Sequence, residues 1–190
     1  MKSMDLGGPD DWLHDLDAAL QAGDTRAIGL IDGGDDSAGR ASINAVMQRV
    51  TGATDGPRRE SLLVRTRCFA SRNLDRQDDQ PPGIPPATAS PLGRWKETEI
   101  PLPIGARPSW TERQFPQWMV QWRREFQLIV VQLGAINSSA ARRLGCCMDQ
   151  NILLLGPRRS AGPEWLMEQI ALHSRAGAHI SGSILLQPAA

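Results

Sequence analysis

The chain lacks several features that mark common classes of protein. Lys plus Arg equals Asp plus Glu at 21 each, so no net charge attracts nucleic acid or an anionic membrane to the whole surface. The three cysteines, Cys68 and the adjacent Cys146 and Cys147, form neither a disulfide framework nor a zinc spacing. The three histidines are scattered and have no acidic companion at ligand spacing, so no metal site is expected. Tyrosine is absent altogether.

Long apolar runs are also missing. No run is long enough for a membrane-spanning helix, and the first residues contain no segment of signal-peptide length. We therefore expect a soluble protein in the cytoplasm. A chain of 190 residues is long enough for one well-buried core and too short for two comfortable ones, so residues 1–190 are expected to form a single domain.

Short apolar runs alternate with helical patterns along the chain. Runs with the length of buried strands fall at residues 27–31, 61–64, 128–133, 152–155 and 180–186. Helical periodicity is found at residues 10–20, 39–50, 138–144 and 163–177. Because the runs show no polar alternation and helices separate them, we expect an α/β fold: one three-layer domain with a mostly parallel central sheet.

The middle of the chain departs from this alternation. Residues 67–98 are polar and then rich in proline, a composition that cannot bury enough apolar area to stay compact. We expect an exposed, flexible loop over this range. Residues 99–103 alternate apolar side chains with Pro101 and Pro103, which favours an edge strand over a central one.

An aromatic helix is expected after this segment, with Thr111 and Gln114 as a capping box at its start. Its apolar positions are spaced by three, four and seven residues: Phe115, Trp118, Met119, Trp122 and Phe126. These aromatic side chains are interpreted as core. The alternative is that Trp118 and Trp122 meet a protein partner, since tryptophan is enriched at interfaces.

A damaged phosphate-binding loop lies between the first apolar run and the helix that follows it. Gly34 and Gly39 have the spacing of such a loop, and a strand before it and a helix after it are the required context. The lysine position holds Arg40 and the next hydroxyl position holds Ala41, while Ser42 offers a hydroxyl one residue late. The pattern indicates a vestigial nucleotide-binding loop.

With these elements in order, the chain resembles the deviant P-loop ATPases of the MinD/ParA group. Among them it is most similar to the cytoplasmic domain of the bacterial tyrosine kinases of capsular and exopolysaccharide production. Residues 125–136 resemble the Walker B segment, and residues 152–155 and 175–186 resemble the last two strands. The resemblance implies a P-loop NTPase-like fold in which a lysine neutralises phosphates and a hydroxyl and aspartates serve magnesium.

The acidic positions that this resemblance implies are filled by other residues. Two aspartates are implied after the strand at residues 61–64, where the chain has Arg65 and Arg67. The Walker B aspartate is replaced by Gln132, and magnesium prefers carboxylate ligands. We therefore expect no catalytic residue, no metal and no cofactor. Without tyrosine the chain cannot be a tyrosine autokinase.

Two acids inside the loop add to this interpretation. Asp35 and Asp36 would oppose a bound triphosphate. Pairing of these acids with Arg40, Arg65 or Arg67 would close the vacant pocket on itself, and ordinary solvation is the alternative.

Other constellations have simpler explanations. Ser138 and Ser139 have no neighbouring histidine and no nucleophile elbow, so they are interpreted as a helix cap. Paired arginines could make a local basic patch for nucleic acid, and exposed helix ends are the alternative. They are residues 123–124, 142–143 and 158–159.

The leading hypothesis is a catalytically inactive accessory or scaffold protein of bacterial exopolysaccharide or capsule biosynthesis or export, acting through protein contacts. The resemblance implies a membrane-embedded chain-length or export protein, or an active homologue, as partner, and allows self-association. Such a protein would be cytoplasmic, or peripheral to the inner membrane through its partner. The alternatives are a divergent ATPase that binds ATP and magnesium with Arg40 and Ser42, and a MinD/ParA-like spatial regulator.

Overall fold

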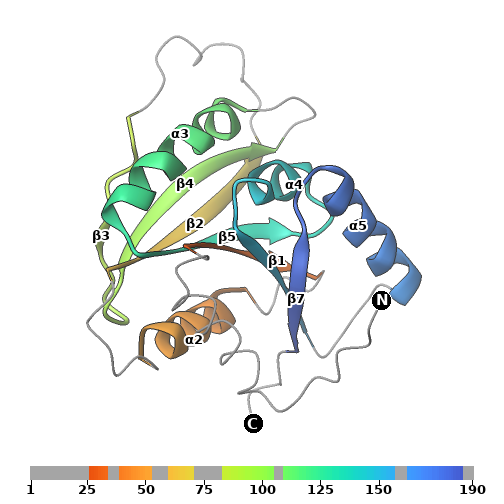
Figure 1. The fold of residues 1–190 in the computed structure, drawn as a ribbon, viewed down its shortest axis with the longest axis horizontal. Coiled ribbons are helices and arrows are strands. Elements are labelled where there is room, and N and C mark those ends of the chain that lie inside the picture. The colour runs from red at the N-terminus through yellow and green to blue at the C-terminus, as the bar shows by residue number, and fades with distance from the viewer. Residues whose placement is uncertain are drawn as a thin grey trace.

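The computed structural model describes residues 26–33, 39–52, 60–70, 83–104, 109–156 and 162–185 (Figure 1). The predicted helix at residues 10–20 lies outside these ranges. The described strands are β1 (Ala27–Asp32), β2 (Ser61–Ala70), β3 (Thr88–Ala89), β4 (Lys96–Ile104), β5 (Leu128–Ala135), β6 (Gln150–Leu155) and β7 (Ile180–Leu185). The described helices are α2 (Gly39–Gly52), α3 (Trp110–Glu125), α4 (Ser139–Gly145) and α5 (Pro163–Arg175).

The strands form one sheet in the order β3-β4-β2-β5-β1-β6-β7. Every neighbouring pair is parallel except β3 with β4. Helix α2 lies on one face of the sheet, and α3, α4 and α5 lie on the other (Figure 1). The predicted three-layer α/β fold with a mostly parallel sheet is thus confirmed.

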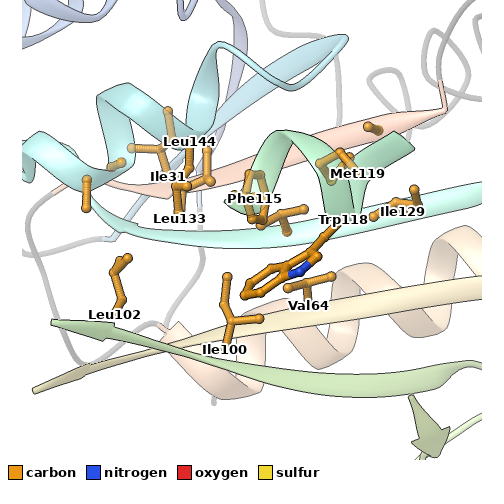
Figure 2. Close-up of a cluster of buried hydrophobic side chains, with 14 of the residues drawn as sticks. Ile31, Val64, Ile100, Leu102, Phe115, Trp118, Met119, Ile129, Leu133 and Leu144 are labelled. Atoms are coloured by element: carbon orange, nitrogen blue, oxygen red, sulfur yellow. The ribbon is translucent and has the colours of Figure 1, made fainter. Parts of the chain in front are cut away.

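The larger core lies between the sheet and helices α3, α4 and α5 (Figure 2). Trp118 and Trp122 are each 2 % exposed and Phe115 is fully buried. The rings of Phe115 and Trp122 meet edge to face with centroids 6.1 Å apart, a favoured aromatic geometry. The interpretation of these residues as core is confirmed. Side chains buried to this extent offer little surface, which counts against the alternative of partner contacts through Trp118 and Trp122.

The start of α3 differs from the predicted capping box. Ser109 is the N-cap, and its side chain accepts a hydrogen bond from the backbone N–H of Glu112. Thr111 instead donates its hydroxyl to the Pro101 carbonyl at 2.6 Å, which ties the helix to β4. Pro116 lies inside the helix, where it removes one backbone donor.

The flexible loop predicted for residues 67–98 extends too far at both ends. Residues 67–70 continue β2, and β4 begins at Lys96 after a two-residue pairing with β3. The reason is backbone pairing: β2 and β4 run side by side in parallel register from Leu62 and Lys96 to Ala70 and Ile104. Residues 71–82 lie outside the described part of the chain. Among the described strands, only the two-residue β3 pairs with the outer side of β4, in line with the edge character that its prolines predict.

The C-terminal elements agree with the predicted ranges. In α5 the apolar Met167 is 46 % exposed. Gln169 and His173 are the buried residues of this helix. Gly177 follows α5 with a φ of 83°, a conformation that favours glycine after a helix. In the described ranges, no helix has the length and apolar character needed to cross a bilayer.

Candidate functional site

The predicted loop joins the end of β1 to the start of α2. In an open parallel sheet, ligands bind at the carboxyl ends of the strands. Strand β1 pairs with β5 on one side and β6 on the other, and β2 lies beyond β5. The residues that could act on a ligand held by this loop therefore come from the ends of β1, β5 and β2.

Only part of the predicted loop is described. Gly34, Asp35 and Asp36 lie outside the described residues, and so does any pairing of these acids with arginines. Gly39, Arg40 and Ser42 form the first turn of α2. The structure describes their helical backbone and not their side chains, so the roles predicted for Arg40 and Ser42 stay predictions.

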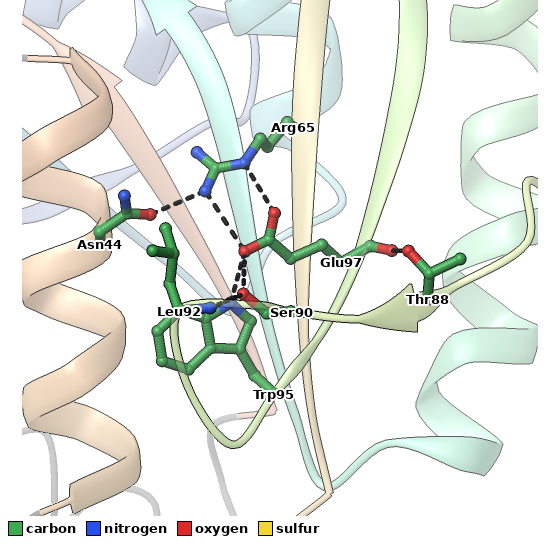
Figure 3. A network of polar contacts seen from close by, with 7 residues as sticks. All are labelled: Asn44, Arg65, Thr88, Ser90, Leu92, Trp95 and Glu97. Atoms are coloured by element: carbon green, nitrogen blue, oxygen red, sulfur yellow. Dashed lines mark hydrogen bonds and ion pairs between the residues drawn. The ribbon is translucent and has the colours of Figure 1, made fainter.

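Arg65 lies on β2 with its side chain 13 % exposed and turned beneath α2 (Figure 3). Its Nε donates to Oε2 of Glu97 at 3.2 Å, and its Nη2 donates to Oδ1 of Asn44 at 2.7 Å. Glu97 is on β4 and Asn44 on α2, so one guanidinium joins three elements. Where the resemblance implies an aspartate, the structure therefore has an arginine whose positive charge is largely neutralised by an ion pair.

Glu97 is held by more than its arginine. Its Oε1 also accepts hydrogen bonds from the Ser90 hydroxyl and from Nε1 of Trp95, the latter at 2.9 Å. Burial disfavours the charged form of this carboxyl, but the hydrogen bonds from Ser90, Arg65 and Trp95 outweigh it and hold its pKa below the ordinary value. Glu97 is therefore a carboxylate with its acceptor positions filled.

The ion pair of Arg65 and Glu97 runs diagonally between β2 and β4. In the sheet register Arg65 lies opposite Glu99, and Leu63 lies opposite Glu97. The Arg65 side chain thus reaches back along β4 to a residue two positions earlier. Arg67 lies further along β2 and forms only a surface pair with Glu99 at 3.7 Å, with side chains 75 % and 48 % exposed. Arg65 and Arg67, which stand where the resemblance implies two aspartates, therefore have different roles.

Gln132 lies on β5 between the other two strands. It is opposite Leu30 of β1, and it follows Val131, the last β5 residue that pairs with β2. Val130 and Leu30 belong to the core beneath α2, so strand alternation places Gln132 on the same face as α2. Its side chain is half-buried, and β5 continues past it to Ala135. Gln132 thus places a neutral amide where the resemblance implies a metal ligand.

A magnesium ion does not fit the described residues of this edge. Arg65 presents N–H donors and Gln132 a neutral amide at positions where Mg²⁺ prefers carboxylate oxygens. Asp32, at the end of β1, is the one carboxylate among the described ends of β1, β2 and β5 on this face, and it already takes part in another interaction. No group of three or more metal-binding side chains is found in the described part of the chain.

The paired arginines support the structure where they are described. Arg123 makes a bidentate pair with Asp149, whose Oδ2 also accepts from the backbone N–H groups of Arg26 and Ala27 at the start of β1. Burial opposes ionisation of Asp149, but these bonds lower its pKa. Arg143 pairs with the buried Glu112 and joins α4 to α3. These contacts favour the structural interpretation over a nucleic-acid patch, and residues 158–159 lie outside the described ranges.

The turn after β5 carries the predicted helix cap and contacts a buried histidine of α5. Ser138 is the N-cap of α4 and accepts from the N–H of Ala141, as expected. His173 of α5 is fully buried, and its Nε2 lies 2.8 Å from the carbonyl of Ile136. Since a carbonyl only accepts, Nε2 carries the hydrogen. Burial lowers the pKa of His173, and the nearby Arg142 lowers it further against the opposing effect of the Ile136 bond.

Sequence reasoning missed Glu97 and Asn44 as partners of Arg65. Both are ordinary polar residues, and Glu97 lies inside the range interpreted as a flexible loop. The sequence contained one signal. Arginines at alternate positions of a strand share one face, and if that face is buried they need acids on a neighbouring strand. Without the strand order, no particular acid could be chosen.

Comparison with known proteins identifies the fold. No family model matches the sequence, and no curated protein matches it. Among solved structures, the kinase domain of the Escherichia coli tyrosine kinase ETK matches with a TM-score of 0.65 and 14% identity, over 94% of this chain and 76% of that one. The VpsO kinase domain matches with a TM-score of 0.66 and 13% identity, over 96% of this chain and 100% of that one.

The tyrosine kinase domain of BceF is a third match, with a TM-score of 0.60 and 13% identity, over 91% of this chain and 75% of that one. At these identities the likeness establishes the fold. The chain is thus a single α/β domain with the P-loop NTPase-like fold of the bacterial tyrosine kinase domains.

Proposed function

We propose that this protein is a catalytically inactive, P-loop-derived accessory or scaffold protein of bacterial exopolysaccharide or capsule biosynthesis or export. It acts in the cytoplasm through protein contacts. The partner we propose is a membrane-embedded chain-length or export protein, or an active homologue of the same fold. The biological setting follows from the resemblance to the tyrosine kinases of this process, and the shared fold supports it.

The observation that carries the proposal is the ion pair of Arg65. A metal-dependent phosphoryl transfer needs carboxylates at the ends of the strands beside the phosphates. Arg65 is bound to Glu97 and Asn44 beneath α2, so it contributes to folding in a place where an acid would serve magnesium. Gln132 replaces the second acid, and an amide attracts a divalent ion far less than a carboxylate does.

A direct test compares turnover of radiolabelled ATP by the full chain and by Arg40→Ala, both with magnesium. We expect no phosphate release and no phosphoryl transfer above the buffer blank for either protein. The Arg40→Ala variant is the control for contamination, because turnover by contaminating ATPases would be the same in both preparations. Turnover by the wild-type chain that Arg40→Ala removes would establish a divergent ATPase and contradict the proposal.

The scaffold part needs a separate measurement. The tagged chain is purified from native membranes, and proteins that accompany it are identified. A polysaccharide export protein or an active tyrosine kinase homologue is the expected companion. Recovery of neither, together with a cell that makes normal polysaccharide after deletion of the protein, would contradict the assignment to this process.

A further inference from the structure

The two edges of the sheet differ in how they are protected. At the β4 edge, Pro101 and Pro103 remove backbone donors, and the short β3 covers the start of the strand. At the other edge, β7 has the sequence Ile-Ser-Gly-Ser-Ile-Leu, which contains neither proline nor a charged residue. Prolines, charges and covering segments are the usual devices that keep an exposed edge from pairing with another chain. Of these two edges, only the β4 edge carries them.

The outer side of β7 is open over most of the strand. Strand β7 pairs with β6 and with no other described strand. A register shift near Ser181 interrupts its beginning, and residues 182–185 then pair regularly with residues 152–155. Leu185 is 59 % exposed, and a methyl group at Gly182 would meet no atom within 4 Å. Residues 182–185 are thus accessible to a further strand.

Helix α5 lies beside β7 at this end of the sheet and has an exposed side of its own (Figure 1). Glu164, Met167, Ala171 and Arg175 follow one another at spacings of three and four residues, so they share one side of the helix, and all four are exposed. The middle of this side is apolar, with Met167 46 % exposed next to the small Ala171. Another helix can therefore pack closely against it.

The charges of α5 are complementary to a second copy of the same helix. Glu164 and Glu168 lie in its first half and Arg175 in its last turn, and none of the three forms an ion pair within the described part of the chain. If two copies of α5 run antiparallel, the acids of each lie near Arg175 of the other, whereas a parallel arrangement places like charges together. A two-fold axis perpendicular to the sheet at the β7 edge makes both the helices and the strands antiparallel.

We propose that this protein forms a two-fold symmetric dimer in which β7 of each copy pairs with β7 of the other and the α5 helices pack antiparallel beside them. The strand offers only four regular residues, which is too little for a stable interface, so the helix contact is required. The proposed function names a different protein as partner, and two strands, β1 and β6, separate β7 from β5 and its Gln132. Either proposal can therefore fail without the other.

The first test is sedimentation velocity of the full chain over a wide range of protein concentrations. We expect a reversible transition from a species of 20.8 kDa to one of twice that mass. Leu185→Lys places a charge at the paired edge and should raise the dissociation constant of the dimer at least about tenfold, which corresponds to 1.4 kcal/mol. Leu92→Lys makes the same change at a position 52 % exposed in the turn between β3 and β4, and it should leave this constant unchanged.

The second test distinguishes this dimer from one that forms through another surface. Arg175→Glu makes every exposed charge of α5 negative, and the double variant Glu164→Lys with Glu168→Lys makes every one positive. Each variant alone should dimerise less than the wild-type chain, because like charges then face each other. An equimolar mixture of the two should recover association as a heterodimer, a result that loss of folding cannot produce.

The outcomes that would overturn the inference are specific. They are a chain that stays monomeric at all concentrations, a dimer that Leu185→Lys and Leu92→Lys affect equally, and a mixture of charge variants that associates no better than its components. Thermal unfolding of each variant shows whether it is folded. Because the charge variants lie on the exposed side of α5 and leave β7 intact, they decide the question even if Leu185→Lys fails to fold.

Discussion

The two faces of the sheet are built differently. On the face of α3, α4 and α5, aromatic rings fill a continuous core, and the ionic pair of Glu112 and Arg143 joins two helices across it. On the face of α2 the core is smaller, and at its edge lie Arg65 with an unpaired nitrogen and the half-buried Gln132. The first face therefore supplies most of the buried core, while the second carries the residues that stand where the resemblance implies acids. Packing and the residues of the candidate site thus depend on different faces of the sheet.

The largest expected effect comes from the aromatic face. Trp122→Ala removes a side chain that is 2 % exposed and contacts the rings of Phe115 and Trp118. We expect it to destabilise the protein by about 3–5 kcal/mol, because the cavity cannot fully collapse. Urea unfolding measures this. Val120→Ala, at a position 54 % exposed on the same helix, should change stability by less than about 0.5 kcal/mol. Similar losses for both variants would show that this face is not the main core.

A smaller effect is expected when the polar face is disturbed. Glu97→Gln removes the charge that balances the part-buried Arg65, and we expect a loss of about 2 kcal/mol. Glu99→Gln breaks the exposed pair with Arg67 and should change stability by less than about 0.5 kcal/mol. Chemical denaturation of the two variants compares them directly. Equal effects would mean that the Arg65 pair is no more important than a surface contact.

The pH dependence of the same variant gives a second measurement. Because the pKa of Glu97 is lowered on folding, its contribution is present above the unfolded pKa and is lost as the pH falls through the folded value. Between pH of about 5 and about 3, wild-type stability should therefore fall more steeply than that of Glu97→Gln. Parallel curves would show that Glu97 does not titrate differently in the two states.

The smallest effect is expected at His173. Its folded pKa lies below the ordinary value of 6.5, so the unfolded chain takes up a proton first and stability falls as the pH drops below that value. His173→Gln keeps an N–H donor for the Ile136 carbonyl and should flatten the decline between pH of about 7 and about 5. His179→Gln, at an exposed position, should keep the wild-type slope. A decline that His173→Gln leaves unchanged would assign it to other groups.

Local patterns predicted the elements well. The strands at 27–31 and 128–133, the cap at Ser138 and the start of α5 at Pro163 depend on neighbours within one turn or one strand, so sequence carried them. The edge character of β4 also followed from its prolines. The prediction of a loop at residues 67–98 was wrong at its ends, because β2 and β4 stabilise each other across a long connection. Composition does not reveal such pairing.

The relative placement of Arg65 and Gln132 could be expected from the resemblance, but their contacts could not. Arg65 and Gln132 do lie on neighbouring strands of the face covered by α2, as a resemblance to a P-loop fold implies. The role of Arg65 changed because its charge is matched by Glu97, a residue 32 positions away in sequence. A partner at that separation is chosen by strand order and register, and neither can be read from residue types.

The sequence by itself determined the alternation of strands and helices, the absence of tyrosine and the loss of acids at the expected positions, because these depend on residue identity and short-range periodicity. Only the tertiary structure decided that Trp118 and Trp122 are core, that Arg65 is neutralised, and that one of its nitrogens is left without a partner. The physical reason is that burial and pairing belong to contacts between elements. The role of a charged side chain therefore depends on the residues that folding places beside it.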